Sequence, residues 1–140
     1  MPQREIEMIL TRHLASYLAI PIFLVDMQGT LVFYNEPAEL LLGMRFHETG
    51  EMPIDEWSVI FKPVDEHGAP ITPNGLPLVI AIAEQRPAHR RFFIHGLDQT
   101  RRHIELTAFP LIGQAGRALG AVALFWEVDE PSAGEEKAQP

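Results

Sequence analysis

The sequence predicts an α+β domain built around an antiparallel sheet, and three observations indicate this fold class. The chain has 140 residues, of which 46% are hydrophobic, so a single domain can bury a core. Segments with helical spacing of apolar residues precede and separate segments rich in β-branched and aromatic residues. The last three β-rich segments follow one another with short turns between them, and consecutive hairpins of this kind form antiparallel sheets.

The first predicted element is an amphipathic helix within residues 1–19, with its apolar stripe over residues 4–18. Apolar side chains recur there at spacings of three and four, as they do on one face of a helix. The stripe consists of Ile6, Ile9, Leu10, His13, Leu14, Tyr17 and Leu18. Pro21 is expected to close this helix.

The predicted main domain spans residues 20–129 and begins with two strands, at residues 22–26 and 30–34. A helix is predicted to start after Asn35, whose side chain is suited to accept backbone N–H groups. Gly43 is expected to end that helix.

The middle of the chain, residues 44–77, carries five prolines and is expected to hold only short helical turns, such as one around residues 55–61. A longer helix is predicted over residues 76–85. Three strands and a tail complete the prediction. The strands are expected at residues 90–95, 103–111 and 118–128, and a disordered tail at residues 130–140.

The last predicted strand is apolar on both faces and therefore needs cover on both sides. Internal helices can cover one face, which leaves the N-terminal helix or a second copy of the protein for the other. We therefore expect a dimer interface formed by Ile6, Leu10, Leu14, Tyr17, Val122, Leu124 and Trp126. On the opposite face, the small side chains of Ala108, Ala121 and Ala123 leave volume that either helices or a small molecule can fill.

Three segments together resemble PAS domains of bacterial sensory proteins. They are PIFLVDMQGTLVFYN at residues 21–35, a middle segment with Trp57, DEHG at 65–68 and LPL at 76–78, and RHIELTAFPL at residues 102–111. The resemblance implies a PAS-like five-stranded antiparallel sheet with flanking helices and an N-terminal amphipathic helix. It also implies that the inner sheet face holds a ligand or cofactor. Transferred to this chain, the ligand-binding residues are Phe23, Val25, Leu78, Ile82, Phe92, Ile94, Ile104, Leu106, Ala108, Ala121, Ala123 and Phe125.

The cofactors of the family can be tested against the sequence. Light-sensing members that resemble the flavin and coumaroyl types use a cysteine, and this chain has none. Haem-binding members commonly bind iron through a histidine on the long helix, and residues 76–86 contain none. The usual acidic–hydrophobic–threonine ending of the domain is altered to Glu127-Val128-Asp129, which puts the usual coupling to a downstream effector in doubt. The sequence therefore identifies no cofactor.

Catalytic and metal sites receive little support from the residues. Acidic pairs occur at residues 55–56 and 65–66, but adjacent carboxylates in loops are typical of solvated turns, and no nucleophile or phosphate-loop motif accompanies them. His95 and His103 could face each other across a hairpin and, with His89, suggest a metal site. Their predicted strand phase is the outer one and carboxylates are lacking nearby, so the interpretation as surface residues is favoured.

Composition narrows the function further. A net charge of −8, from 19 acidic and 11 basic residues, argues against direct nucleic-acid binding. No apolar run reaches the ~18 to 20 residues of a membrane span, and the N-terminus lacks a secretory signal, so we expect a cytoplasmic protein away from membranes. Cysteine is absent, which excludes disulfides, thiolate nucleophiles and zinc–thiolate sites.

We therefore expect a homodimeric sensory or signal-transduction module that binds a small apolar ligand or a signalling protein partner. The alternative is a purely structural dimerisation or scaffold module whose cavity is fully packed. A third hypothesis is a small enzyme, which would need a buried polar or charged group that the sequence does not reveal. The sequence leaves open the identity of the ligand and whether the chain is complete or is a domain of a larger sensor.

Overall fold

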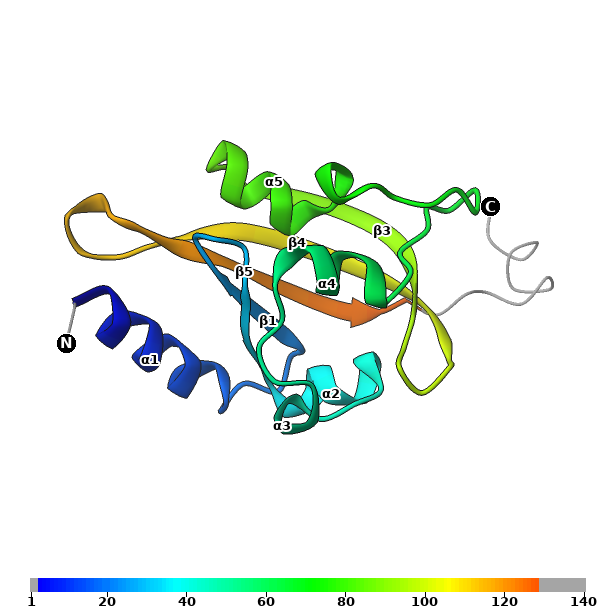
Figure 1. Cartoon of the computed structure of the whole chain (residues 1–140), viewed down its shortest axis with the longest axis horizontal. Helices are drawn as coiled ribbons and strands as arrows, with labels where there is room; N and C mark the ends of the chain where they lie inside the picture. The colour runs from blue at the N-terminus through cyan, green and yellow to red at the C-terminus, as the bar shows by residue number, and fades with distance from the viewer. Residues whose placement is uncertain (1–2, 129–140) are drawn as a thin grey trace, which may run out of the picture.

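Five strands form one antiparallel sheet in the spatial order β2-β1-β5-β4-β3 (Figure 1). The computed structural model describes residues 3–128. The strands are β1 (Ile22–Asp26), β2 (Leu31–Tyr34), β3 (Ala88–His95), β4 (Arg101–Ile112) and β5 (Ala118–Glu127). The predicted α+β fold with a five-stranded antiparallel sheet is confirmed, and each predicted strand is present within a few residues of its expected bounds.

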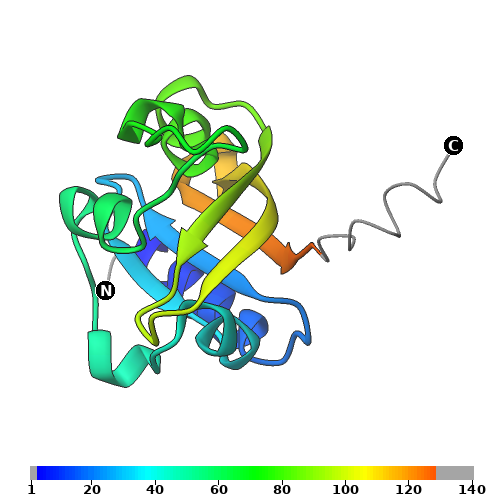
Figure 2. The same ribbon diagram turned by 90° about the vertical axis from the view of Figure 1, so that its right-hand side faces the viewer.

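Helices lie on both sides of this sheet. They are α1 (Gln3–Ala15), α2 (Glu36–Leu42), α3 (Phe46–Thr49), α4 (Ile54–Ile60) and α5 (Pro77–Glu84), with single 3₁₀ turns η1 (Pro73–Gly75) and η2 (Gln114–Gly116). Figures 1 and 2 show α1 on one side of the sheet, with α4 and α5 on the other. Helix α3 is a single turn within residues 44–77, where short helical turns were expected without this position being specified.

Two apolar clusters follow from this arrangement. The larger cluster lies between the inner sheet face and helices α2, α4 and α5, and it includes Phe23, Trp57 and Phe125. The smaller cluster lies on the outer face, where Ala15 and Met8 of α1 meet side chains of β1, β2 and β5. Central strand β5 contributes to both clusters, as its two apolar faces predicted.

Helix α1 ends at Ala15, earlier than the predicted end at residue 18. The backbone N–H groups of Tyr17 and Leu18 bond to the carbonyl oxygens of Leu14 and Ala15, at 3.0 and 3.1 Å, which closes tighter turns after the helix. The side-chain amide of Asn35 also donates to the carbonyl oxygens of Ala15 and Leu18, at 3.2 and 3.3 Å. These bonds satisfy carbonyl groups that a continuing helix would have used.

Helix α2 begins and ends as the sequence predicted. Asn35 is its N-cap, and the Asn35 Oδ1 atom accepts a hydrogen bond from the Ala38 N–H at 3.3 Å. Gly43 follows the helix with a φ of 82°, a left-handed conformation that favours glycine.

The β3–β4 hairpin does not pair His95 with His103. Its register places Phe93 opposite His103 and His95 opposite Arg101, because the connecting turn closes with a 2.9 Å bond from the Gly96 N–H to the Thr100 carbonyl. The suggestion that His95 and His103 could face each other is therefore wrong. Within residues 3–128, no group of three or more His, Asp or Glu side chains is arranged to hold a metal ion.

The predicted tail at residues 130–140, and Asp129 of the altered closing motif, lie outside the described residues. Within the described part of the chain, every helix is too short or too polar to cross a membrane.

Candidate functional site

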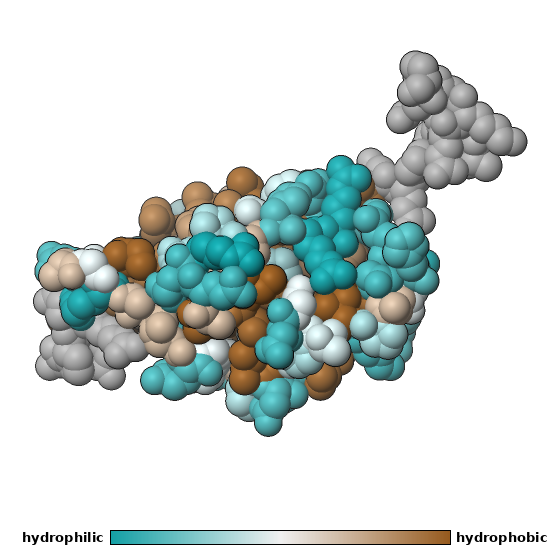
Figure 3. Space-filling view, turned by 90° about the horizontal axis from the view of Figure 1, so that it is seen from above, coloured by the Kyte–Doolittle hydropathy of each residue, from teal (hydrophilic) through white to brown (hydrophobic). Residues whose placement is uncertain are grey.

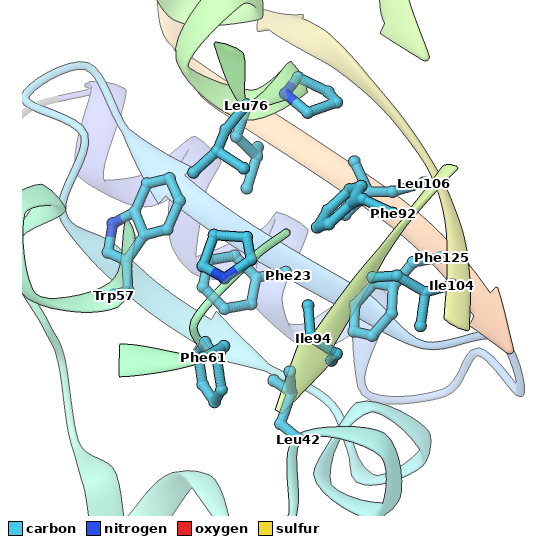
Figure 4. A pocket seen from close by; sticks show the side chains of 13 residues that line it. Phe23, Leu42, Trp57, Phe61, Leu76, Phe92, Ile94, Ile104, Leu106 and Phe125 are labelled. Atoms are coloured by element: carbon cyan, nitrogen blue, oxygen red, sulfur yellow. The ribbon is translucent and has the colours of Figure 1, made fainter. Parts of the chain in front are cut away.

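An apolar cavity of about 60 Å³ lies on the inner face of the sheet, beneath α4, α5 and the segment that connects them (Figure 4). Thirteen side chains line it. They are Phe23, Leu42, Trp57, Phe61, Pro63, Leu76, Pro77, Leu78, Phe92, Ile94, Ile104, Leu106 and Phe125. The labelled side chains in Figure 4 come from the sheet on one side and from the helices on the other, and they surround one common space.

The sheet supplies one wall through strand alternation. Phe92 and Ile94 of β3 lie two residues apart, as do Ile104 and Leu106 of β4, so each pair points to the same face. Phe125 of β5 pairs with Leu106 across the sheet. The period of two that predicted an inner apolar face therefore also places these side chains around the cavity.

The opposite wall is formed by short elements rich in aromatic residues and proline. Trp57 packs edge-on against Phe23, with ring centroids 5.4 Å apart, and its indole Nε1–H donates to the Gly29 carbonyl at 2.7 Å. That indole nitrogen is the sole polar side-chain atom among the thirteen lining residues, and its hydrogen bond is already made. The lining therefore offers a ligand no free hydrogen-bonding side chain.

Backbone hydrogen bonds fasten this wall to edge strand β3. Val64 exchanges two bonds with Phe93, at 3.0 and 2.9 Å, and the His95 N–H donates to the Phe61 carbonyl at 2.7 Å. The Leu97 N–H donates to the Leu42 carbonyl at 2.8 Å, which ties the end of α2 to the β3–β4 turn. The segments opposite the sheet are thus joined to β3 and to the β3–β4 turn by backbone hydrogen bonds, with the cavity between them and the sheet.

Seven of the residues predicted to bind a ligand line this cavity, and five do not. The lining members are Phe23, Leu78, Phe92, Ile94, Ile104, Leu106 and Phe125. Val25, Ala108, Ala121 and Ala123 are buried in the same cluster away from the cavity, and Ile82 packs against that cluster half-buried. Helix α5 packs over β4 and β5, the strands that carry the three alanines.

Six lining residues were not among the predicted set: Leu42, Trp57, Phe61, Pro63, Leu76 and Pro77. For two of these residues the sequence contains a spacing that could have identified them. Trp57 and Phe61 lie four residues apart within the predicted helical turn around residues 55–61, and this spacing places two side chains on one helical face. The position of Pro63 depends on the irregular segment after α4, for which the sequence shows no period.

Helix α1 presents its apolar stripe to solvent rather than to the sheet. Leu10 and Leu14 are each 63% exposed and Tyr17 is 75% exposed, while Ala15 is buried and Met8 is half-buried against the outer sheet face. Met8 and Ala15 thus form part of the inward side of α1. Among residues 3–128, the wide apolar stripe remains exposed.

The predicted dimer-interface residues fall into two groups in the structure. Ile6, Leu10, Leu14, Tyr17 and Trp126 are exposed, whereas Val122 is buried and Leu124 is half-buried in the outer cluster. Val122 was expected to point outward from an open sheet face. It does point to that face, but α1 of the same chain covers it, so Val122 is not part of the exposed surface.

Polar contacts hold α1 in place. The Glu7 carboxylate accepts hydrogen bonds from the Gln114 N–H at 2.9 Å and from the Arg117 guanidinium, both in the β4–β5 connection. The Arg12 guanidinium lies over the ring of Phe33, 5.0 Å from its centroid. These contacts hold α1 with its apolar side exposed among residues 3–128.

The acidic pairs lie away from the cavity. Asp55 and Glu56 are exposed in the first turn of α4. The Asp65 carboxylate accepts hydrogen bonds from the N–H groups of His67 and Ala69, at 2.8 and 2.9 Å, and these bonds lower the pKa of Asp65. Glu66 lies 3.1 Å from the His103 imidazole, and Glu105 lies 2.7 Å from the His89 imidazole. The expectation that carboxylates are lacking near these histidines is therefore wrong. These carboxylates shape turns and surface pairs.

The family can now be assigned. A family model described as PAS fold matches residues 17–133. The chain belongs to the PAS fold family. PAS domains are typically sensory or signalling modules, and the cavity lies on the sheet face at which the resemblance placed the ligand site. No curated protein matches the sequence.

Solved structures of other PAS domains share this fold. The LOV protein of Rhodobacter sphaeroides superposes with a TM-score of 0.67 at 17% identity, over 97% of this chain and 74% of that chain. The PAS domain of BvgS from Bordetella pertussis gives 0.55 at 13% identity, over 94% and 93%. The light-state dimer of the fungal blue-light photoreceptor Vivid gives 0.59 at 14% identity, over 78% of each chain.

Large PAS cofactors do not fit the cavity. Drug-sized ligands occupy pockets of roughly 300 to 1,000 Å³, and haem and flavin groups are at least that large, whereas this cavity measures about 60 Å³. Its lining contains no histidine, and the whole sequence contains no cysteine. The residues present therefore match neither an iron ligand nor a thiol-linked chromophore.

Proposed function

We propose that this PAS domain is a homodimeric sensory module that transmits a signal through α1 and responds to a small apolar molecule in its cavity or to a signalling protein partner. The observation that carries the proposal is the exposed apolar stripe of α1. Vivid, which has the same fold, is described as a dimer in its light state, and this description supports a dimeric assembly here.

The exposed side chains of α1 argue for a second copy as the partner. Ile6, Ile9, Leu10 and Leu14 line one side of the helix and Tyr17 follows its end, and each of them is at least one-third exposed in the single chain. Removing apolar surface from water is worth about 25 cal/mol per Å², so covering this stripe favours association. Figure 3 shows that patches of hydrophobic residues also reach the surface on another face, interspersed with hydrophilic ones.

The dimer is tested by replacing one exposed leucine with aspartate and measuring molar mass by light scattering. We expect the wild type to be dimeric at micromolar concentration and Leu14→Asp to be monomeric, because a charge in a desolvated apolar interface is costly. Leu40→Asp is the matched control, since Leu40 is 74% exposed on α2 and lies outside the proposed interface. A monomeric wild type, or a Leu14→Asp variant that stays dimeric, would count against the proposal.

A second candidate is a structural dimerisation module whose cavity binds nothing. The small size of the cavity and the complete burial of Ala108, Ala121 and Ala123 favour it. Native mass spectrometry under conditions that retain bound molecules distinguishes the ligand-binding sensory module from the structural module. A dimer that forms without any retained or added ligand supports the structural module. We do not propose catalysis, because the cavity lining carries no ionisable side chain.

A further inference from the structure

We infer that the cavity admits a neutral molecule of about two to four non-hydrogen atoms that forms no hydrogen bonds, a class that comprises dissolved gases and short hydrocarbons. This inference rests on the proposed sensory function and narrows it to one class of ligand. It also separates this chain from domains of the same fold that hold large cofactors.

The first support is the volume of the cavity. A cavity needs about 10 to 15 Å³ of such space to hold one water molecule, so a cavity of about 60 Å³ has room for only a few water-sized groups. An apolar protein cavity of about 150 Å³ takes up benzene or xenon. The present cavity is less than half that size, so it can accept an atom or a small molecule, but a six-membered ring is too large for it.

The second support is the chemistry of the lining. Leucine, isoleucine, phenylalanine, proline and tryptophan make up all thirteen lining residues, and the Trp57 Nε1–H is occupied by the Gly29 carbonyl. A ligand with a hydroxyl, amide or charge would lose its hydrogen bonds to water and gain none. An apolar ligand has no hydrogen bonds to water to lose, and it gains dispersion contacts with the lining side chains.

The third support is the way in which one wall of the cavity is held in place. The wall beside β3 is held by the paired bonds of Val64 and Phe93 and by the His95–Phe61 bond, and Trp57 is fixed by its bond to Gly29. These bonds hold the wall beside β3 and the Trp57 ring close to the sheet, so widening the cavity on this side would break several of them. The cavity is open to solvent only in part.

Isoleucine methyl signals provide a direct test with xenon as the probe. The wild-type protein, labelled at isoleucine δ1 methyl groups, is titrated with xenon under pressure and followed by NMR. Ile94 and Ile104 line the cavity, whereas Ile22 is equally buried in the outer cluster and serves as the control. We expect saturable shifts for Ile94 and Ile104 and none for Ile22. Shifts that stay linear with pressure at all three methyl groups would overturn the inference.

A second experiment enlarges the cavity and tests whether it then accepts a larger ligand. Leu78→Ala removes a lining side chain, so benzene, which we expect the wild type to exclude, should bind at least tenfold more tightly to the variant. Leu24→Ala removes a buried leucine from the outer cluster and should leave the Ile94 and Ile104 signals unmoved by benzene. Benzene binding by the wild type at these methyl groups would contradict the size limit. Ethane and dioxygen, titrated separately, distinguish a hydrocarbon from a dissolved gas.

Failure of the cavity inference and failure of the proposed function give different experimental results. A flavin, haem or polar metabolite retained in native mass spectra would overturn the inference and leave the sensory function standing. Saturable xenon binding in a protein that is monomeric would support the cavity inference and remove the dimeric module.

Discussion

Asn35 shows how a single side chain can connect separate parts of this fold. It is 1% exposed, and its Oδ1 atom accepts from the Ile22 N–H at 2.9 Å as well as from the first turn of α2. Its Nδ2 atom donates to the carbonyl oxygens of Ala15, Leu18 and Ile20, at 3.2, 3.3 and 2.9 Å. One amide thus joins the end of α1 and the linker after it to the sheet.

Replacing Asn35 with aspartate should therefore release the segment between α1 and β1 from the sheet. In Asn35→Asp the three carbonyl oxygens lose their donor and face a buried carboxylate instead, so we expect the free energy of unfolding to fall by roughly 3 kcal/mol or more. Urea unfolding measures the loss, and hydrogen exchange should rise over residues 15–20. Asn74→Asp in exposed η1 is the control and should change little. Equal stability of the two variants would show that these bonds contribute nothing.

At the scale of elements, the β3–β4 turn and the end of α2 support each other. The Arg102 guanidinium donates to the Leu41 carbonyl at 2.8 Å, near the negative end of the helix dipole. It also donates to the Asp98 carboxylate, at 3.2 and 2.9 Å. Leu42, the next residue of the helix, lines the cavity. The Asp98–Arg102 ion pair therefore holds the end of α2 next to a residue that lines the cavity.

The Asp98–Arg102 pair predicts a loss of stability in acid. The Arg102 hydrogen bond lowers the pKa of Asp98 from its ordinary 3.8 to about 2. A carboxylate with a depressed pKa in the folded state stabilises the protein fully above the unfolded value, and this stabilisation disappears as pH falls from about 4 to about 2. Asp98→Asn should thus be less stable than wild type at pH 7, by less than ~1 kcal/mol for so exposed a pair.

Urea midpoints measured from pH 7 down to pH 2 check this expectation. The gap between wild type and Asp98→Asn should narrow as pH falls through the window between the two pKa values. Glu51→Gln, at an exposed site before Met52, is the control. A gap that stays constant with pH would mean that the Asp98 charge is not the source of the difference.

The sequence predicted the elements of this fold better than their mutual placement. Periods of two and of three to four residues, together with Asn35 and Gly43, were sufficient for the strands and for α2, because those signals are local. The register of the β3–β4 hairpin depends on how its turn closes, which the histidine pattern did not reveal. The cavity wall at Phe61 and Pro63 depends on an aperiodic segment bonded to β3. The apolar stripe of α1 was predicted, but its outward orientation follows from polar contacts of Glu7 and Arg12 with distant residues.

At the scale of the whole molecule, a small cavity and an exposed helix face lie on opposite sides of the sheet. The cavity of about 60 Å³ lies in the inner cluster, while the outer side of α1 is exposed among residues 3–128. Strands β1 and β5 carry side chains of both clusters, so a ligand in the cavity and a partner on α1 would act on the same two strands. This arrangement suits a module in which occupancy of a small cavity influences an assembly surface.

The freshly purified protein should be colourless, and added hemin should not bind specifically. The sequence has no cysteine for a thiol-linked chromophore, the cavity lining has no histidine, and the volume is too small for a haem or flavin ring system. Absorption spectra before and after titration with hemin check this. We expect no visible band at first and no Soret change that saturates at one equivalent. His89→Ala serves as a control, because the exposed His89 could attract hemin to the surface. A Soret band that saturates at one equivalent in both proteins would mean that the inner face opens far enough to hold a cofactor.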